Sequence, residues 1–208
     1  IKVNTSADGG VIEAVDFVEP EGHTMLGQEQ LKWLVDGLKA SKATWKFVFF
    51  PVEINPYFSE FLRVGKEQKV PLILDAVGDG FAGYPTERDQ FLKLHQDGTV
   101  KNMVFLTGDA HEAAMRKGDA TCPPIFMAAA LDINKSPLMS MVGTIGPTYG
   151  ISVDEAWTEW WQGKNGKGED ANGFGRIRVV TEPAHKLICE CIDFKGKLLH
   201  TMEIEAVQ

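Results

Sequence analysis

The chain has 208 residues, of which 44% are hydrophobic and 24% charged, so it can bury a substantial core as one large domain or two small ones. Its net charge of −8 argues against non-specific binding to a nucleic-acid backbone, which requires a basic face. No apolar run approaches the roughly 20 residues that span a bilayer, and no signal peptide is visible; because the first residue is Ile1, we expect a processed product or a fragment.

Strands and helices are predicted to alternate through the first half of the chain. Apolar residues recur at helical spacing after Gly27, which marks a helix start. Trp33 lies off that apolar stripe and is expected to pack against a neighbouring element. The order strand, helix, strand, helix, strand then predicts an α/β sheet with right-handed crossovers. Its segments are a strand at 45–50, a helix at 58–68, a short buried strand at 71–74, a glycine-rich loop that starts at Val77, a helix capped by Thr86 and ended by Asp97-Gly98, and a strand at 102–107.

The second half of the chain is less regular until its last third. A strand is predicted at 125–130, and a helix at 153–162 carries Trp157, Trp160 and Trp161, which either line a substrate cleft or pack the core. Alternating residues predict a terminal hairpin or meander added to the edge of the sheet, with strands at 175–180, 186–193 and 198–204. Because no linker separates these segments, we expect a single domain over residues 1–208.

The three cysteines predict neither a disulfide framework nor a zinc site. Cys122, Cys189 and Cys191 are odd in number and lack C-x-x-C spacing. We therefore expect free thiols, which do not identify a cellular compartment.

Residues 103–112 form the strongest candidate for a functional site. Four consecutive apolar residues predict a strand buried on both faces, and the chain turns polar at Thr107. Asp109 and His111 follow at the C-terminal end of that strand, where ligands bind in open α/β sheets. A carboxylate and an imidazole on one short turn can share a divalent or trivalent cation, or form an orienter–base pair. The alternative is an ordinary strand-to-loop corner, with Asp109 capping backbone N–H groups and His111 on the surface.

Two further acids flank the glycine-rich loop. Asp75 ends one predicted strand, and Asp79 follows in the loop itself. If strands 71–74 and 102–107 are neighbours, both acids share one edge of the sheet with the Asp109 turn, and such convergence favours a site. The alternative is that Asp75 caps a turn and that Asp79 belongs to a surface turn.

Other polar residues near this region have two interpretations each. Tyr84 either presents a phenol to the site as a donor or ligand, or is a packed aromatic at a helix entrance. Arg88, Arg116 and Lys117 either hold an anion or are simply solvated. His95 falls on an apolar helix face and is expected to pack rather than to bind.

Four motifs follow one another along the chain, and a fifth precedes the terminal strands. They are Leu26-Gly27-Gln28-Glu29-Gln30-Leu31-Lys32-Trp33-Leu34, Ala43-Thr44-Trp45-Lys46, Asp79-Gly80-Phe81-Ala82-Gly83-Tyr84-Pro85-Thr86-Glu87-Arg88, Leu106-Thr107-Gly108-Asp109-Ala110-His111 and Gly173-Phe174-Gly175-Arg176. Taken together and in this order across residues 25–205, they resemble the C-terminal half of the PhoD-type alkaline phosphatases, which are calcineurin-like metallophosphoesterases. Phe81 stands where a tryptophan is common in that family, which puts substrate contacts in question rather than the fold.

The resemblance implies a calcineurin-like fold in α/β/β/α layers with a C-terminal antiparallel β-hairpin. It implies hydrolysis of phosphate mono- or diesters by water activated on a metal cluster, typically iron with calcium or another divalent ion. Asp109 and His111 match the family's late motif, which implies catalytic and metal-binding roles for both. By the same resemblance Asp79 and Tyr84 are expected to bind substrate, in or beside the site. Family members are often exported, so the resemblance also implies a periplasmic or secreted protein.

The family's earlier metal ligands lie upstream of the Leu-Gly-x-x-Gln helix, and residues 1–24 are too few to hold them. We therefore expect the C-terminal half of a larger metal-dependent phosphatase or phosphodiesterase, with the upstream half of the same protein as its partner. Its substrate would be a small phosphate ester. The alternative is a non-catalytic fragment or binding module that keeps half of the fold as an assembly surface.

Overall fold

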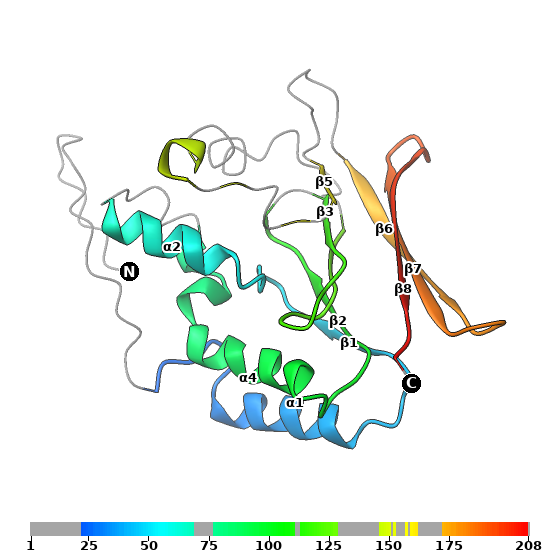
Figure 1. The fold of residues 1–208 in the computed structure, drawn as a ribbon, viewed down its shortest axis with the longest axis horizontal. Coiled ribbons are helices and arrows are strands. Elements are labelled where there is room, and N and C mark those ends of the chain that lie inside the picture. Colours follow the sequence, from blue (N-terminus) through cyan, green and yellow to red (C-terminus); the bar gives the residue numbers. More distant parts are fainter. Residues whose placement is uncertain are drawn as a thin grey trace.

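The structure is a computed structural model that describes residues 22–68, 77–110, 113–128, 146–150, 152, 157, 159–161 and 172–207. Its helices and strands lie in two sheets and one helical layer (Figure 1). In chain order they are α1 (Gln28–Ala40), β1 (Lys46–Phe49), α2 (Phe58–Glu67), η1 (Phe81–Gly83), α4 (Pro85–Gln96), β2 (Met103–Thr107), β3 (Ala113–Arg116), β4 (Ile125–Met127), η2 (Gly146–Tyr149), β5 (Glu159–Trp161), β6 (Gly173–Val180), β7 (Lys186–Asp193) and β8 (Leu198–Glu205).

The first sheet is five-stranded, in the order β1-β2-β4-β3-β5. β1, β2 and β4 run parallel to one another, whereas β3 is antiparallel to both of its neighbours. Parallel neighbours require crossover connections, and α2 and α4 lie in the stretch of chain between β1 and β2. The mixed α/β class expected from the sequence is therefore confirmed.

The first sheet is covered on both faces, which explains why the first four residues of β2 are apolar. Val48 and Phe105 face the helices α1, α2 and α4, in one buried cluster. Val104 and Phe126 face the second sheet, in another buried cluster. Successive strand residues point to opposite faces, so a strand between two layers needs a continuous apolar run.

Four phenylalanines join the helical layer to the first sheet. The ring of Phe50, just after β1, lies 4.9 Å from Phe81, 5.3 Å from Phe91 and 5.4 Å from Phe105, in edge-on or tilted contacts. Such pairs add roughly 0.5–1.5 kcal/mol each beyond simple burial. They fix η1 and α4 against the C-terminal ends of β1 and β2, where the candidate residues lie.

The second sheet corrects the prediction for the last third of the chain. The three predicted strands are present as β6, β7 and β8, and they form an antiparallel meander. They constitute a separate sheet that packs face to face on the first one, so the expectation that they extend its edge is wrong. Leu187, Cys189 and Cys191 all point into the space between the sheets, and this apolar face needs a partner layer rather than a partner edge.

Most predicted elements of the first half are confirmed, with two corrections. α4 begins at Pro85 rather than behind a Thr86 cap, because the fixed φ and missing N–H of proline suit the first helical position. Trp33 is 71% exposed, so the expectation that it packs against a neighbour is wrong. The strand predicted at 71–74 lies outside the described residues.

The prediction of a helix at 153–162 is wrong over its last residues. Residues 159–161 form β5, which pairs antiparallel with β3. Aromatic residues suit strands, and the free edge of β3 offers hydrogen bonds that helical spacing alone does not reveal. Trp157 is 3% exposed and packs near Phe58, with ring centroids 6.1 Å apart, so it belongs to the core.

The three cysteines are free and buried, as expected. In the described part of the chain, every helix is too short or too polar to cross a lipid bilayer.

Candidate functional site at the ends of β1 and β2

The turn after β2 has an unusual backbone conformation. Asp109 has a φ of 72°, and the N–H of Ala110 donates to the carbonyl of Gly108 at 2.9 Å. A hydrogen bond from residue i+2 to residue i around a positive φ defines a γ-turn of the rare, strained kind. Aspartate tolerates the left-handed region better than most residues, yet it still carries a Cβ that glycine would lack.

This turn presents a carboxylate to solvent at the end of a buried strand. Asp109 is exposed, whereas Thr107, two positions earlier, is 9% exposed. No described residue donates a hydrogen bond to the Asp109 carboxylate, so the capping alternative gains no support. Strained residues persist where the surrounding structure fixes them, often at functional sites. His111 lies outside the described residues, and its proximity to Asp109 stays a prediction.

The segment that leaves β1 lies directly beside this turn. The N–H of Phe50 donates to the carbonyl of Leu106 at 2.9 Å, which continues the ladder past the last residue of β1. A Cβ placed on Gly108 would lie 3.6 Å from the carbonyl oxygen of Pro51. Residues 51–55 therefore run along the same edge of the sheet as Asp109.

Glu53 is a candidate that the sequence analysis missed. One carboxylate oxygen accepts from the N–H of Asn55, and the other, Oε2, is buried with no partner in the described structure. Burial raises the pKa of Glu53 from 4.5 to about 7, against an opposing effect of the backbone N–H groups of Asn55 and Ile54. The signal available in the sequence was a carboxylate just past a predicted strand end, at the edge that also carries Asp109.

Asp79 reaches this edge through the glycine-rich loop. The N–H of Phe81 donates to the carbonyl of Glu53 at 2.9 Å, and a Cβ on Gly80 would lie 3.1 Å from the same oxygen. The close approach favours glycine at position 80. Asp79 is exposed beside this contact, so the 51–55 segment lies against both the Asp109 turn and the Asp79 loop.

The Asp79 loop and the Asp109 turn do not meet in the way that the sequence suggested, which was through pairing of strand 71–74 with β2. Both edges of β2 are occupied, by β1 on one side and β4 on the other. The expected neighbour, the strand at 71–74, lies outside the described residues together with Asp75. The exit of β1, which we did not single out from the sequence, supplies the connection instead.

Tyr84 is half-buried where η1 meets α4. Its ring stacks on that of His23, with centroids 4.5 Å apart and planes at 11°. The carboxylate of the buried Glu87 accepts hydrogen bonds from the N–H groups of Met25 and Leu26, at 2.8 and 3.2 Å. Glu87 therefore ties the segment before α1 to α4, and that segment carries His23 over Tyr84.

Several other candidates have structural roles. Nε2 of His95 lies 2.7 Å from the carbonyl oxygen of Asp119, in agreement with a packing histidine. The guanidinium of Arg88 binds Ser59 and Asp89, and that of Arg116 binds Asp119 at 2.7 Å. Neither arginine is directed to the Asp109 turn by these contacts.

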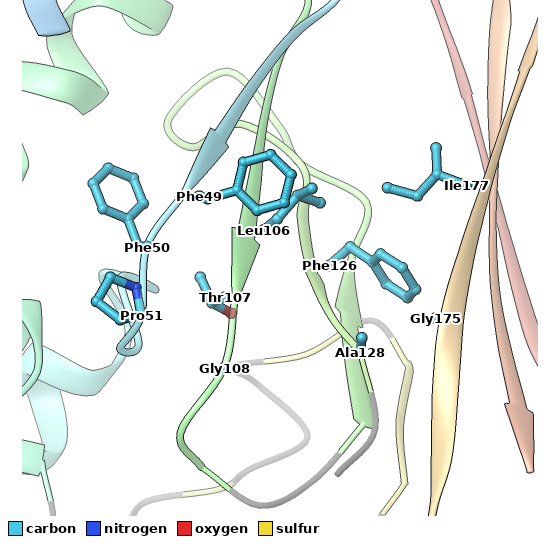
Figure 2. Close-up of a pocket in the computed structure, with 10 residues that line it drawn as sticks. All are labelled: Phe49, Phe50, Pro51, Leu106, Thr107, Gly108, Phe126, Ala128, Gly175 and Ile177. Atoms are coloured by element: carbon cyan, nitrogen blue, oxygen red, sulfur yellow. The ribbon is translucent and has the colours of Figure 1, made fainter. Parts of the chain in front are cut away.

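An apolar cleft of about 660 Å³ opens beside the same strand ends, between the first and the second sheet (Figure 2). It borders Gly108 and extends to β6 of the second sheet. Its lining consists of Phe49, Phe50, Pro51, Leu106, Thr107, Gly108, Phe126, Ala128, Gly175 and Ile177.

The described residues supply part of a metal site at most. Asp109 offers an exposed carboxylate, which suits a hard cation. Within the described ranges, no group of three or more His, Cys, Asp or Glu side chains is close enough to hold a metal ion. A complete coordination sphere at Asp109 therefore needs ligands from beyond the described residues.

The layers, the parallel strands and the exposed carboxylate at a strand end define a mixed α/β protein with a polar edge suited to ligands. The family model of the PhoD-like phosphatases matches residues 8–183. The chain belongs to the PhoD-like phosphatase family.

Two relatives support this assignment at different levels. A solved structure of PhoD superposes with a TM-score of 0.52 at 14% identity, over 99% of this chain and 40% of that chain, which shows similarity of fold. Alkaline phosphatase D of Bacillus subtilis (strain 168) is 28% identical over 88 residues, which are 42% of this chain and 14% of that protein. The chain thus spans less than half of the length of either relative.

Proposed function

We propose that this chain is the C-terminal half of a metal-dependent phosphatase that hydrolyses phosphate mono- or diesters. The observation that carries the proposal is the strained, exposed Asp109 turn at the C-terminal end of a buried central strand, in a member of the PhoD-like phosphatase family. Relatives named PhoD and alkaline phosphatase D support the reaction class. The substrate we propose is a small phosphate ester.

Asp109 and His111 would hold divalent or trivalent metal ions, which by resemblance would be iron with calcium or another divalent ion. When bound, such ions lower the pKa of a coordinated water and offset charge on the phosphoryl oxygens. The γ-turn fixes the backbone at Asp109, and its exposed carboxylate is open to a ligand. Asp79 and Tyr84 would contact the substrate from the adjoining loop.

The layer arrangement supports a calcineurin-like fold. Helices, first sheet and second sheet correspond to three of the layers of an α/β/β/α sandwich, and the antiparallel meander β6–β8 forms the second of the two β layers. The fourth layer would come from the upstream half of the same protein, which we propose as the partner of this chain. We further propose a periplasmic or secreted location, which cell fractionation with a tagged protein would check.

A second candidate function is a non-catalytic binding module. It is favoured by the lack of a cluster of three potential metal ligands among the described side chains. Such a module would keep the half-fold as an assembly surface and would bind no metal.

Hydrolysis of p-nitrophenyl phosphate and bis(p-nitrophenyl) phosphate distinguishes these proposals. We expect weak or no turnover by the 208-residue chain and metal-dependent turnover once the sequence upstream of Ile1 is included. Full metal-dependent turnover by the 208-residue chain would contradict the half-protein proposal. No turnover by the extended protein with any of iron, calcium, manganese or zinc would favour the binding module.

A further inference from the structure

Tyr84 is connected to the candidate site by a short chain of contacts. The N–H of Tyr84 donates to the carbonyl of Phe81 at 3.2 Å, and the N–H of Phe81 donates to the carbonyl of Glu53 at 2.9 Å. Residues 51–55, which include Glu53, run along the same edge of the sheet as Asp109. These bonds fix the backbone at Tyr84 relative to that edge, but they do not fix the direction of its side chain.

The side chain of Tyr84 is supported by the ring of His23. The two rings are stacked, with centroids 4.5 Å apart and planes at 11°. His23 is exposed and Tyr84 is half-buried, so the imidazole covers the phenol from the solvent side. Stacked rings attract each other beyond simple burial, and a covered side chain has fewer accessible rotamers than an open one. The stack therefore restricts where the phenol can lie.

The position of His23 follows from a buried carboxylate on α4. Glu87 is 2% exposed, and its carboxylate accepts hydrogen bonds from the N–H groups of Met25 and Leu26, at 2.8 and 3.2 Å. Hydrogen bonds to a carboxylate are among the stronger ones in proteins. They hold the segment before α1 beside the start of α4 (Figure 1). Because His23 lies only two residues before Met25, the same bonds keep its ring over Tyr84.

We propose that His23 is a positioning residue of the substrate site and acts through Tyr84. The proposal rests on the proposed function, in which Tyr84 contacts the phosphate ester. The imidazole holds the phenol in the orientation that meets the substrate, and Glu87 holds the segment that carries the imidazole. A binding group that is already in place loses less entropy when the substrate arrives. His23 therefore increases the affinity for substrate without touching the reacting atoms.

Proton NMR of the 208-residue chain tests the stack without reference to catalysis. The imidazole protons of His23 lie against the aromatic face of Tyr84, so the ring current should shift them to higher field. Tyr84→Leu should abolish this shift, whereas Tyr84→Phe, which keeps the aromatic ring, should preserve it. Glu87→Gln should reduce it, because an amide offers one acceptor oxygen in place of two. The imidazole protons of the exposed His185 are the control and should not change.

Steady-state kinetics test the positioning role in the extended protein, which includes the sequence upstream of Ile1. His23→Ala should raise the KM for p-nitrophenyl phosphate by roughly two- to tenfold, which is the range expected for one stacked pair. It should leave kcat nearly unchanged, as expected when only binding is weakened. His23→Phe should restore the KM, because a flat ring again covers Tyr84. His185→Ala, which changes an exposed histidine, should behave like the wild type.

A double-mutant cycle separates action through Tyr84 from independent action. Tyr84→Phe removes the phenol oxygen and should raise the KM on its own. Adding His23→Ala to Tyr84→Phe should raise it no further, because the group that His23 positions is already absent. Coupled residues show such non-additive effects, whereas independent ones do not.

Four results would overturn the proposal. The first is an unchanged shift of the His23 protons in Tyr84→Leu. The second is an equal KM in the wild type and His23→Ala, which would leave a purely structural contact. The third is an equal loss in His23→Phe and His23→Ala, which would assign the effect to the imidazole nitrogens. The fourth is multiplication of the two effects in the cycle.

The proposed function fails in a different way. If the wild-type extended protein hydrolyses no phosphate ester while the shift of the His23 protons is intact, the stack is correct and the phosphatase activity is not. The positioning role would then be lost together with the proposed function. Normal turnover that is insensitive to His23→Ala would instead overturn the positioning role alone.

Discussion

The backbone strain at Asp109 can be separated from the chemistry of its carboxylate by substitution. The left-handed region costs an L-residue roughly 1–2 kcal/mol, whereas glycine adopts it freely but loses roughly 0.5–1 kcal/mol through its unfolded-state entropy. With φ at 72°, Asp109→Gly should therefore raise the free energy of unfolding by about 1 kcal/mol. For a chain of this size the gain corresponds to about 2–4 °C in Tm. Asp109→Ala keeps the strain and should bring no such gain.

Thermal and urea unfolding followed by tryptophan fluorescence would measure these differences. Asp109→Asn is the matched variant, because asparagine also tolerates the left-handed region but removes the charge. In the extended protein all three substitutions should lose phosphatase activity, so the glycine variant gains stability and loses function. Equal stability of the glycine and alanine variants would refute the argument from strain, and an active glycine variant would refute the role of the carboxylate.

Two further predictions concern burial. Burial in the folded state raises the pKa of Glu53 from 4.5 to about 7, so the folded protein keeps a proton that the unfolded chain releases. The free energy of unfolding should therefore fall as the pH rises from about 4.5 to 7, by on the order of 3 kcal/mol at most. Glu53→Gln should remove this pH dependence. Its free energy of unfolding, measured with urea, should match that of the wild type at pH 4.5 and exceed it at pH 8. The same pH dependence in both proteins would contradict the raised pKa of Glu53. A Cβ on Gly175 would lie 2.8 Å from Phe126 and Ala128, so Gly175→Ala should cost about 1–3 kcal/mol. Gly37→Ala, in an exposed helix position with no atom within 4 Å, is the control and should be neutral or stabilising; equal effects of the two would argue against close contact of the sheets at Gly175.

Local sequence patterns were sufficient for the elements whose signals are local. The apolar run before Thr107 predicted a strand covered on both faces, and β2 has Phe105 toward the helices and Val104 toward the second sheet. The helix after Gly27 likewise follows from spacing. β5 was missed because its stability comes from pairing with β3, a contact between distant segments. Alternation in β7 indicated a strand with one apolar face, but it did not reveal that this face covers another sheet.

The candidate site was predictable in position but not in composition. Asp109 was identified from its place after an apolar run, and its positive φ is a property of the folded turn. Glu53 was missed because its raised pKa arises from burial, which is a property of the folded protein that the local sequence does not show. Asp79 lies against the exit of β1, a connection that the sequence did not suggest.

Metal content tests the central claim most directly. The extended protein, its His111→Ala and Asp109→Ala variants and a control His185→Ala variant, which changes an exposed histidine, would be purified identically and measured by inductively coupled plasma mass spectrometry. We predict bound metal in the wild type and in His185→Ala, and a substantial loss in His111→Ala and Asp109→Ala. Equal metal content in all four proteins would contradict the assignment of Asp109 and His111 as ligands.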